Sequence, residues 1–189
     1  MTASEATTPP LQSPHPTVAA ALQAATNITA KGFTFVGEDS SEHHVSYARF
    51  AERASWVAAH MRERGYKPGD RVVLIVPDNE AFMDLFFGLV WGGMVPVPIY
   101  PPLGLGRLQG YLEQAAHIVE AADAVAVVTT EQVRPILGRL MSRCKSLREV
   151  MRASDLQVEN EGMPVHEARP DDICFIQFTS GSTSRPKGV

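Results

Sequence analysis

Cysteine is scarce in this chain of 189 residues, which contains only Cys144 and Cys174. The two residues form no Cys-X-X-Cys motif, and two isolated thiols make neither a disulfide framework nor a zinc site. Such thiols are typical of a reducing compartment, where they pack as small hydrophobic side chains. The sequence therefore predicts a cytoplasmic protein without a metal site.

Positive charge is missing from the start of the chain, and charge of either sign is missing from residues 85–106. The first Lys or Arg is Lys31, so neither a secretory signal nor a transit peptide is indicated. The uncharged segment is long enough to span a bilayer, but it contains Gly92-Gly93 and four prolines, which no regular helix accommodates. We expect a helix, a turn and a strand there, and no membrane span.

The overall composition is that of a globular protein, with 44% hydrophobic and 20% charged residues. A net charge of −4 gives no reason to expect nucleic acid as a partner. Residues 1–27 are rich in Pro, Ser, Thr and Ala, which predicts a flexible tail in which "TVAAALQAA" can form a short helix. Residues 28–189 are predicted to form the folded part.

Patterns typical of strands and helices alternate along the folded part. Strands are predicted at 33–36, 71–76, 94–99, 124–129 and 172–179, and helices at 47–64, 79–91, 107–121 and 131–144. Strands separated by helices of this length favour an α/β fold with a mostly parallel sheet and right-handed crossovers. The prolines of "MVPVPI" make that strand an edge strand or a short piece.

The last twelve residues, "FTSGSTSRPKGV", concentrate groups that bind phosphate. Five hydroxyl side chains surround Gly181, which lets the backbone approach a ligand, and Arg185 and Lys187 add positive charge. The spacing excludes a Walker A loop, because Pro186 stands where that pattern requires glycine. Ligands of parallel sheets bind beyond the carboxyl ends of strands, and we expect this loop at such an end. The alternative is a Ser/Gly-rich surface linker.

This stretch resembles the signature loop of the AMP-forming acyl- and aminoacyl-adenylating enzymes, in which Tyr or Phe precedes TSG, Ser or Thr, and TGxPKGV. Ser184 departs from the pattern, since the family usually has glycine there. The segment from "VSYARFAERASWVAAHMRERGYKPGDRV" to "VPVPI" is similar to the family's opening unit, and the resemblance covers about residues 30–189. "VPVPIYPP" followed by "RLQGYLEQAAHIVEAADAVAVVTT" looks most like the fatty acyl-AMP ligases.

The resemblance implies a fold, a reaction and a site. The fold would be the first part of the large N-terminal domain of an adenylate-forming enzyme, truncated just after the phosphate loop. A fatty acid would react with ATP and Mg²⁺ to give acyl-AMP and pyrophosphate, and a thiol of an acyl carrier protein or polyketide synthase would take the acyl group. The implied phosphate-binding residues are Thr179, Ser180, Gly181, Ser182, Thr183, Ser184, Lys187 and Gly188. The Mg²⁺ ligand and the catalytic Lys would follow Val189, so no catalytic residue is expected within the chain.

Two other functions remain open, namely a fatty acyl-CoA synthetase and a catalytically silent remnant or interaction module of the same fold. Four further features have a structural alternative to a functional one. These are His43-His44 (metal or solvated turn), Asp171-Asp172 (Mg²⁺ or turn), the helical aromatic residues Phe82, Phe86, Phe87 and Trp91 (lipid pocket or core), and Tyr100 (substrate or partner surface). For the first three we favour the structural alternative. For Tyr100, contact with a substrate or partner is the less favoured interpretation.

Overall fold

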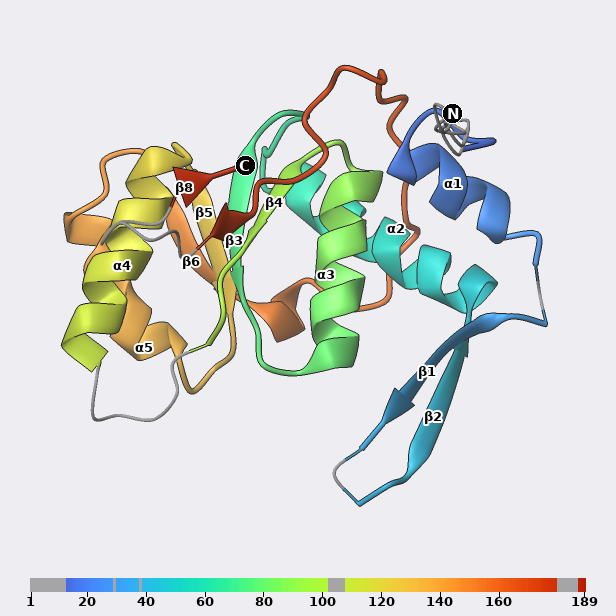
Figure 1. The fold of residues 1–189 in the computed structure, drawn as a ribbon, viewed down its shortest axis with the longest axis horizontal. Helices are drawn as coiled ribbons and strands as arrows, with labels where there is room; N and C mark the ends of the chain where they lie inside the picture. Colours follow the sequence, from blue (N-terminus) through green and yellow to red (C-terminus); the bar gives the residue numbers. More distant parts are fainter. Residues whose placement is uncertain (1–12, 29, 38, 102–107, 180–186) are drawn as a thin grey trace, which may run out of the picture.

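A parallel sheet of four strands forms the centre of the computed structural model (Figure 1), which describes residues 13–28, 30–37, 39–101, 108–179 and 187–189. The strands are β3 (Arg71–Ile75), β4 (Val95–Pro98), β5 (Ala126–Thr129) and β6 (Glu149–Arg152), and their order across the sheet is β4-β3-β5-β6. β3, the first of these four strands along the chain, therefore lies inside the sheet, and β4, the second, lies at one edge. This confirms the predicted parallel α/β fold.

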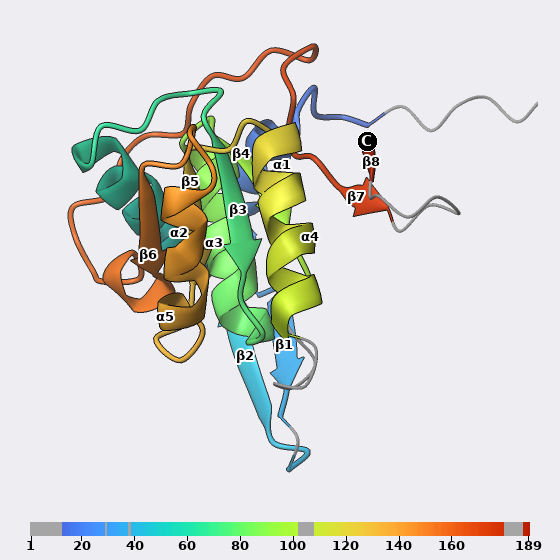
Figure 2. The same ribbon diagram turned by 90° about the vertical axis from the view of Figure 1, so that its left-hand side faces the viewer.

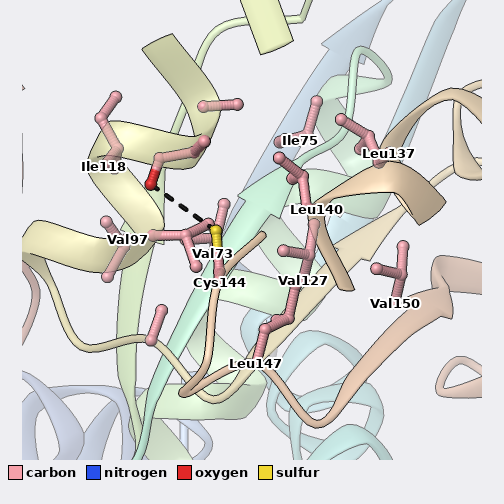
Figure 3. Close-up of a cluster of buried hydrophobic side chains, with 14 of the residues drawn as sticks. Val73, Ile75, Val97, Ile118, Val127, Leu137, Leu140, Cys144, Leu147 and Val150 are labelled. Carbon is pink, nitrogen blue, oxygen red and sulfur yellow. Dashed lines mark hydrogen bonds between the residues drawn. The ribbon is translucent and has the colours of Figure 1, made fainter. Parts of the chain in front are cut away.

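Helices cover both faces of this sheet. The face covered by α2 (Tyr47–Glu63) and α3 (Asn79–Trp91) buries Val72 and Leu74 of β3. The opposite face is covered by α4 (Leu108–Ala121), α5 (Arg134–Leu137) and the 3₁₀ helix η2 (Gly138–Ser142). Figure 3 shows the hydrophobic core on this second face, where Val73 and Val127 of the sheet meet Ile118 and Leu140. Because β3 and β5 are buried on both faces, they read as continuous apolar runs.

The helix boundaries follow from local chemistry. The hydroxyl of Ser46 accepts a hydrogen bond from the backbone N–H of Arg49 at 3.2 Å, and Asp78 caps α3 by accepting from the N–H of Ala81 at 2.7 Å. Just after α2, Gly65 has a φ of 82°, which glycine adopts without strain. Gly93, with a φ of 77°, makes the turn between α3 and β4. Residues 85–101 are thus a helix, a turn and a strand, as predicted.

The N-terminal part adds a helix and a hairpin outside the sheet. Strands β1 (Gly32–Val36) and β2 (Glu42–Ser46) pair antiparallel. Helix α1 (Val18–Ala25) buries Ala19 and contributes Leu22 to a third hydrophobic core with α2 and α3. The short helix predicted within "TVAAALQAA" is confirmed as α1. Residues 1–12 lie outside the described part. No helix of the described residues is long and apolar enough to cross a membrane.

Two predicted elements differ from the structure. The helix expected at 131–144 is α5 followed directly by η2, because Pro135 sits in the first turn and Gly138 follows after only one turn. After it comes β6, which no strong pattern indicated. The strand expected at 172–179 is regular only at Phe178–Thr179, which is β7.

The prolines of β4 explain why residues 172–177 do not pair with that strand in a longer ladder of hydrogen bonds. The N–H groups of Val95 and Ile99 donate to the carbonyls of Asp70 and Leu74, on the β3 side of the strand. The backbone groups that face the outer edge of the sheet are therefore those of Pro96 and Pro98, and proline has no N–H. A strand along this edge finds acceptors but no donors. Only Ile176 bonds there, donating its N–H to the carbonyl of Pro96 at 3.1 Å.

Candidate functional site

The predicted phosphate loop is closed at its base by a short antiparallel ladder. Strand β7 pairs with β8 (Lys187–Gly188), so that Thr179 stands opposite Lys187 and Phe178 opposite Gly188. Gln177 and Val189 extend the ladder by exchanging two backbone hydrogen bonds, of 3.0 and 2.9 Å. Thr179 and Lys187 are therefore the last described residues on the two sides of the predicted loop.

The structure brings together three of the eight predicted phosphate-binding residues, namely Thr179, Lys187 and Gly188. Thr179 and Lys187 are both exposed, one on each strand at the base of the loop. A hydroxyl donor and an ammonium group at this spacing suit a phosphate oxygen. The other five predicted residues lie outside the described part of the chain, and they are Ser180, Gly181, Ser182, Thr183 and Ser184.

Gly188 allows β8 to lie close to the chain that leads into the loop. A Cβ atom at this residue would be 3.1 Å from both Ile176 Cγ2 and Phe178 Cζ, tighter than almost all real contacts. Since Gln177 and Val189 form a hydrogen-bonded pair, Phe178 and Gly188 form a non-hydrogen-bonded pair, in which the two strands lie closer together. Glycine is therefore the residue type that fits the base of this hairpin.

The hairpin is held against the domain by the segment that precedes it. The ring of Phe175 lies 5.7 Å from that of Phe86 on α3, whereas Ile176 and Phe178 pack against the hydrophobic core under α4. Because Phe175 and Ile176 contact opposite helical layers, the segment runs along the β4 edge of the sheet between these layers. The base of the loop is thereby fixed relative to both faces of the fold.

The hairpin lies toward the amino ends of the parallel strands, beside the last turn of α4 (Figure 2). An open groove of about 910 Å³ separates it from that turn and is lined by Arg71, His117, Asp123 and Lys187, among others. The expectation that the loop lies at a carboxyl end holds only for its own strand, β7. For the central sheet it is wrong, because β7 is not a member of that sheet.

Arg71 is a residue of this groove that the sequence pattern did not single out. It begins β3 and contributes a second cation to the groove that Lys187 and the carboxylate of Asp123 also line. The only signal was a charged residue directly before a buried apolar run. Two cations beside a groove can attract an anionic ligand by their summed field.

The remaining candidates have structural roles. Asp172 accepts hydrogen bonds from the backbone N–H of Arg169 at 2.8 Å and from its guanidinium at 3.1 Å, and these bonds hold the pKa of Asp172 below its usual value. His43 and His44 lie on β2 and not on the predicted turn, and His43 Nδ1 is 2.8 Å from a carboxylate oxygen of Glu80. Trp91 is buried, and Phe82, Phe86 and Phe87 are half-buried against the cores, whereas Tyr100 is 76% exposed. Within the described residues, no three metal-ligating side chains are grouped.

Comparison with known proteins agrees with this architecture. A three-layer α/β domain around a parallel sheet is a common architecture of nucleotide-binding proteins. The family model of the AMP-binding enzymes matches residues 22–189. The chain therefore belongs to the AMP-binding enzyme family.

Three similar proteins differ in the acceptor or substrate that their names state. The feruloyl-CoA synthase of Amycolatopsis sp is 30% identical over 77% of this chain and 28% of its own length. The medium-chain-fatty-acid–(acyl-carrier-protein) ligase JamA of Moorena producens is 26% identical over 84% and 27%. The structure of the fatty acid AMP ligase from Legionella pneumophila matches with a TM-score of 0.70 and 27% identity, over 89% and 29%. The chain thus spans little more than a quarter of the length of these proteins.

Proposed function

We propose that this chain is the first part of a longer enzyme that activates a fatty acid with ATP, giving acyl-AMP and pyrophosphate. The observation that carries the proposal is the hairpin base, where Thr179 and Lys187 stand opposite each other at the ends of a loop with four further hydroxyl side chains. The family membership supports adenylate formation. The segments that complete the site in the relatives are proposed to follow Val189.

The described residues fit the phosphate part of ATP. Lys187 and Arg71 provide positive charge beside an open groove, and Gly188 lets the strand that carries Lys187 lie close to the domain. We propose that the hydroxyl groups of 179–184 hold the β- and γ-phosphates, and that Lys187 offsets charge growing on pyrophosphate. ATP brings Mg²⁺, which neutralises phosphate oxygens, and we assign its protein ligand to the part beyond this chain.

The acceptor of the acyl group is proposed to be the phosphopantetheine thiol of an acyl carrier protein or polyketide synthase. The names of JamA and of the Legionella pneumophila ligase support a carrier or an AMP ligase. The feruloyl-CoA synthase favours CoA as the second candidate. We place the reaction in the cytoplasm, where the buried thiol of Cys144 stays reduced.

Carboxylate-dependent exchange of pyrophosphate into ATP tests the activation step. The parent protein is assayed with long-chain fatty acid, ferulate and an amino acid in turn. We expect exchange with the fatty acid, and exchange with only another acid would overturn the substrate assignment. The 189-residue chain alone is the negative control, since we expect it to lack the groups that bind adenine and Mg²⁺. Exchange by the isolated chain would contradict the proposed division of the site.

A further inference from the structure

Five basic residues and no acidic residue lie between Glu131 and Glu149. All five side chains are exposed, in a chain whose net charge is −4. We call them the basic face, and they are Arg134, Arg139, Arg143, Lys145 and Arg148. Such a concentration of one sign in an acidic protein creates a local positive field.

The fold turns the basic face outward. The same stretch buries Leu137, Leu140, Cys144 and Leu147 at spacings of three, four and three residues, and Figure 3 shows these side chains in the core with Val127. A helix-like period with one buried stripe leaves the intervening side chains on the opposite side. The basic residues therefore share the solvent side of α5, η2 and the turn that follows.

Two members of the basic face are tied to the domain. Arg134 donates from Nε to the carbonyl of Val150 at 3.0 Å. Arg148 pairs with Asp70 at 3.1 Å and lies 4.5 Å from the ring centre of Tyr66. These contacts fix the two ends of the face.

The central three, Arg139, Arg143 and Lys145, form no ion pair with any residue that the structure describes. Acidic residues near this end of the sheet have other partners, because Glu131 and Asp155 both pair with Arg152.

One carboxylate of α4 also lies near. Burial raises the pKa of the Cys144 thiol, Glu120 raises it further and Arg143 lowers it, so Glu120 and Arg143 both act on that thiol. Even with Glu120 counted, positive charge is in excess on this face.

We propose that the basic face docks the acidic surface of the acyl carrier partner. The inference rests on the proposed function, which requires a protein thiol to reach the adenylate. Opposite charges on the two surfaces steer encounter and fix orientation more than they add affinity. Met141, 41% exposed between Arg139 and Arg143, supplies an adaptable apolar contact at the centre.

The charge pattern favours a protein partner over the two other anionic partners. Proteins that bind duplex DNA mainly through its backbone neutralise roughly 6–10 phosphates, and this face offers only four cations that form no ion pair with a described residue, Arg134 included. A membrane-surface helix presents a continuous apolar face with aromatic residues, whereas the outer side here exposes only Met141 among its large hydrophobic side chains in the described part.

The test measures binding of the parent protein to a fluorescein-labelled apo acyl carrier protein, which has no thiol to acylate. The charge-reversal variant Arg139→Glu/Arg143→Glu is compared with Lys31→Glu/Arg62→Glu, which reverses two exposed charges elsewhere that also form no ion pair with a described residue. We expect the dissociation constant to rise about tenfold in the first variant and less than about twofold in the second. For the wild type, binding should weaken between about 50 and 200 mM salt.

The outcomes separate docking from chemistry. Pyrophosphate exchange should be equal in the wild type and both variants. Its absence in the wild type would overturn the proposed function, whereas the binding assay would still test the basic face. Equal carrier affinity in the two variants, or wild-type binding that ignores salt, overturns the docking proposal. Vesicles of phosphatidylglycerol and a DNA duplex are tested in parallel. If Arg139→Glu/Arg143→Glu loses binding to the vesicles or to the duplex while carrier binding stays intact, the basic face is assigned to that partner and the docking proposal is overturned.

Discussion

At the scale of single residues, the base of the loop shows what the sequence could and could not predict. The pattern around Gly181 indicated phosphate chemistry, because hydroxyl groups, glycine and Lys are the groups that bind phosphate. The tight contact that selects Gly188 depends on Ile176 and Phe178 folding back against it, and no spacing rule contains that information. Arg71 escaped notice for the same reason, since only the fold brings the start of β3 beside the hairpin.

The Lys187 ammonium group is predicted to act mainly in the transition state. In the parent protein, Lys187→Ala should slow fatty-acid-dependent pyrophosphate exchange by about 30- to 1,000-fold, the effect of losing one preorganised charge contact worth roughly 2–4 kcal/mol. Fatty-acid binding, measured by titration, should change little. Lys187→Arg keeps the charge and should recover part of the rate. An unchanged exchange rate in Lys187→Ala would place this side chain in solvent.

The ion-pair group between α2 and α3 leads to a prediction about pH. Arg53 bonds both Glu80, at 2.7 Å, and the buried Asp84. Burial acts to raise the pKa of Glu80, but hydrogen bonds from Arg53 and His43 outweigh it and hold that pKa below 4.5, its ordinary value. A lowered pKa stabilises the fold above the ordinary value, and this stability is lost as the pH falls through the lowered pKa.

Glu80→Gln should therefore flatten the loss of stability below about pH 4.5, and cost about 2 kcal/mol at neutral pH through two lost charged hydrogen bonds. Urea unfolding from pH 3 to 7 measures both effects. Asp84, whose pKa is raised by burial although Arg53 and Gln157 lower it, is present in both proteins, but the charge of Glu80 also raises its pKa, so the difference contains Glu80 and a smaller change at Asp84. Parallel pH profiles would contradict this account.

At the scale of elements, apolar runs predicted the buried strands well, whereas contacts between distant segments decided the rest. The continuous runs of β3 and β5 follow from burial on both faces, and the prolines of β4 correctly placed it at an edge. The same prolines prevent residues 172–177 from pairing along that edge, although their alternation is typical of a strand. A periodicity rule reads one segment at a time, so it cannot register that the neighbouring edge lacks donors.

Two glycines in helices make a matched pair for testing helix packing. A Cβ atom on Gly88 of α3 would lie 2.5 Å from Val57 Cβ of α2, whereas one on Gly110 of α4 would meet no atom within 4 Å. Gly88→Ala should destabilise the domain by about 1–3 kcal/mol through overpacking. Gly110→Ala should stabilise it by about 0.5–1 kcal/mol, because alanine favours the helix. Thermal unfolding of both variants measures this, and destabilisation of equal size would refute the packing argument.

At the scale of the whole molecule, the segment before the hairpin presents apolar side chains to solvent. Ile173 is 56% exposed, Phe175 43% and Val189 82%, and all three line one groove. These side chains form the apolar part of the groove that Arg71 and Lys187 also line, and exposed apolar side chains grouped in this way mark a surface that packs against something else. In the proposed parent enzyme, the segments after Val189 would cover Ile173 and Phe175 and leave the side of Arg71 and Lys187 open.

The isolated chain should therefore bind a hydrophobic dye and associate as its concentration rises. Ile173→Ser/Phe175→Ser should reduce dye fluorescence, and Val36→Ser/Val158→Ser, which alters two exposed valines elsewhere, should reduce it less. Dye titration and analytical ultracentrifugation give the two measurements. A monomer that melts sharply and binds no dye would show that the groove is covered within this chain.

The acceptor of the acyl group is a property of the whole enzyme, and it separates the two candidate functions. Both candidates share adenylate formation, so only the second half-reaction distinguishes a carrier-protein ligase from a CoA synthetase. We expect transfer to the carrier, because the run "VPVPIYPP" and helix α4 resemble the fatty acyl-AMP ligases and because the basic face suits an acidic protein.

The measurement gives the parent protein a long-chain fatty acid, ATP and Mg²⁺, and then either CoA or a holo carrier protein. Acyl-AMP should accumulate with CoA, whereas the carrier should become acylated, as resolved by mass spectrometry. Salt should slow the carrier reaction, since charge complementarity acts mainly on the association rate, and it should leave pyrophosphate exchange much less affected. Rapid formation of acyl-CoA, with a slow carrier reaction, would instead establish the synthetase, because a surface that admits the CoA nucleotide needs no carrier docking.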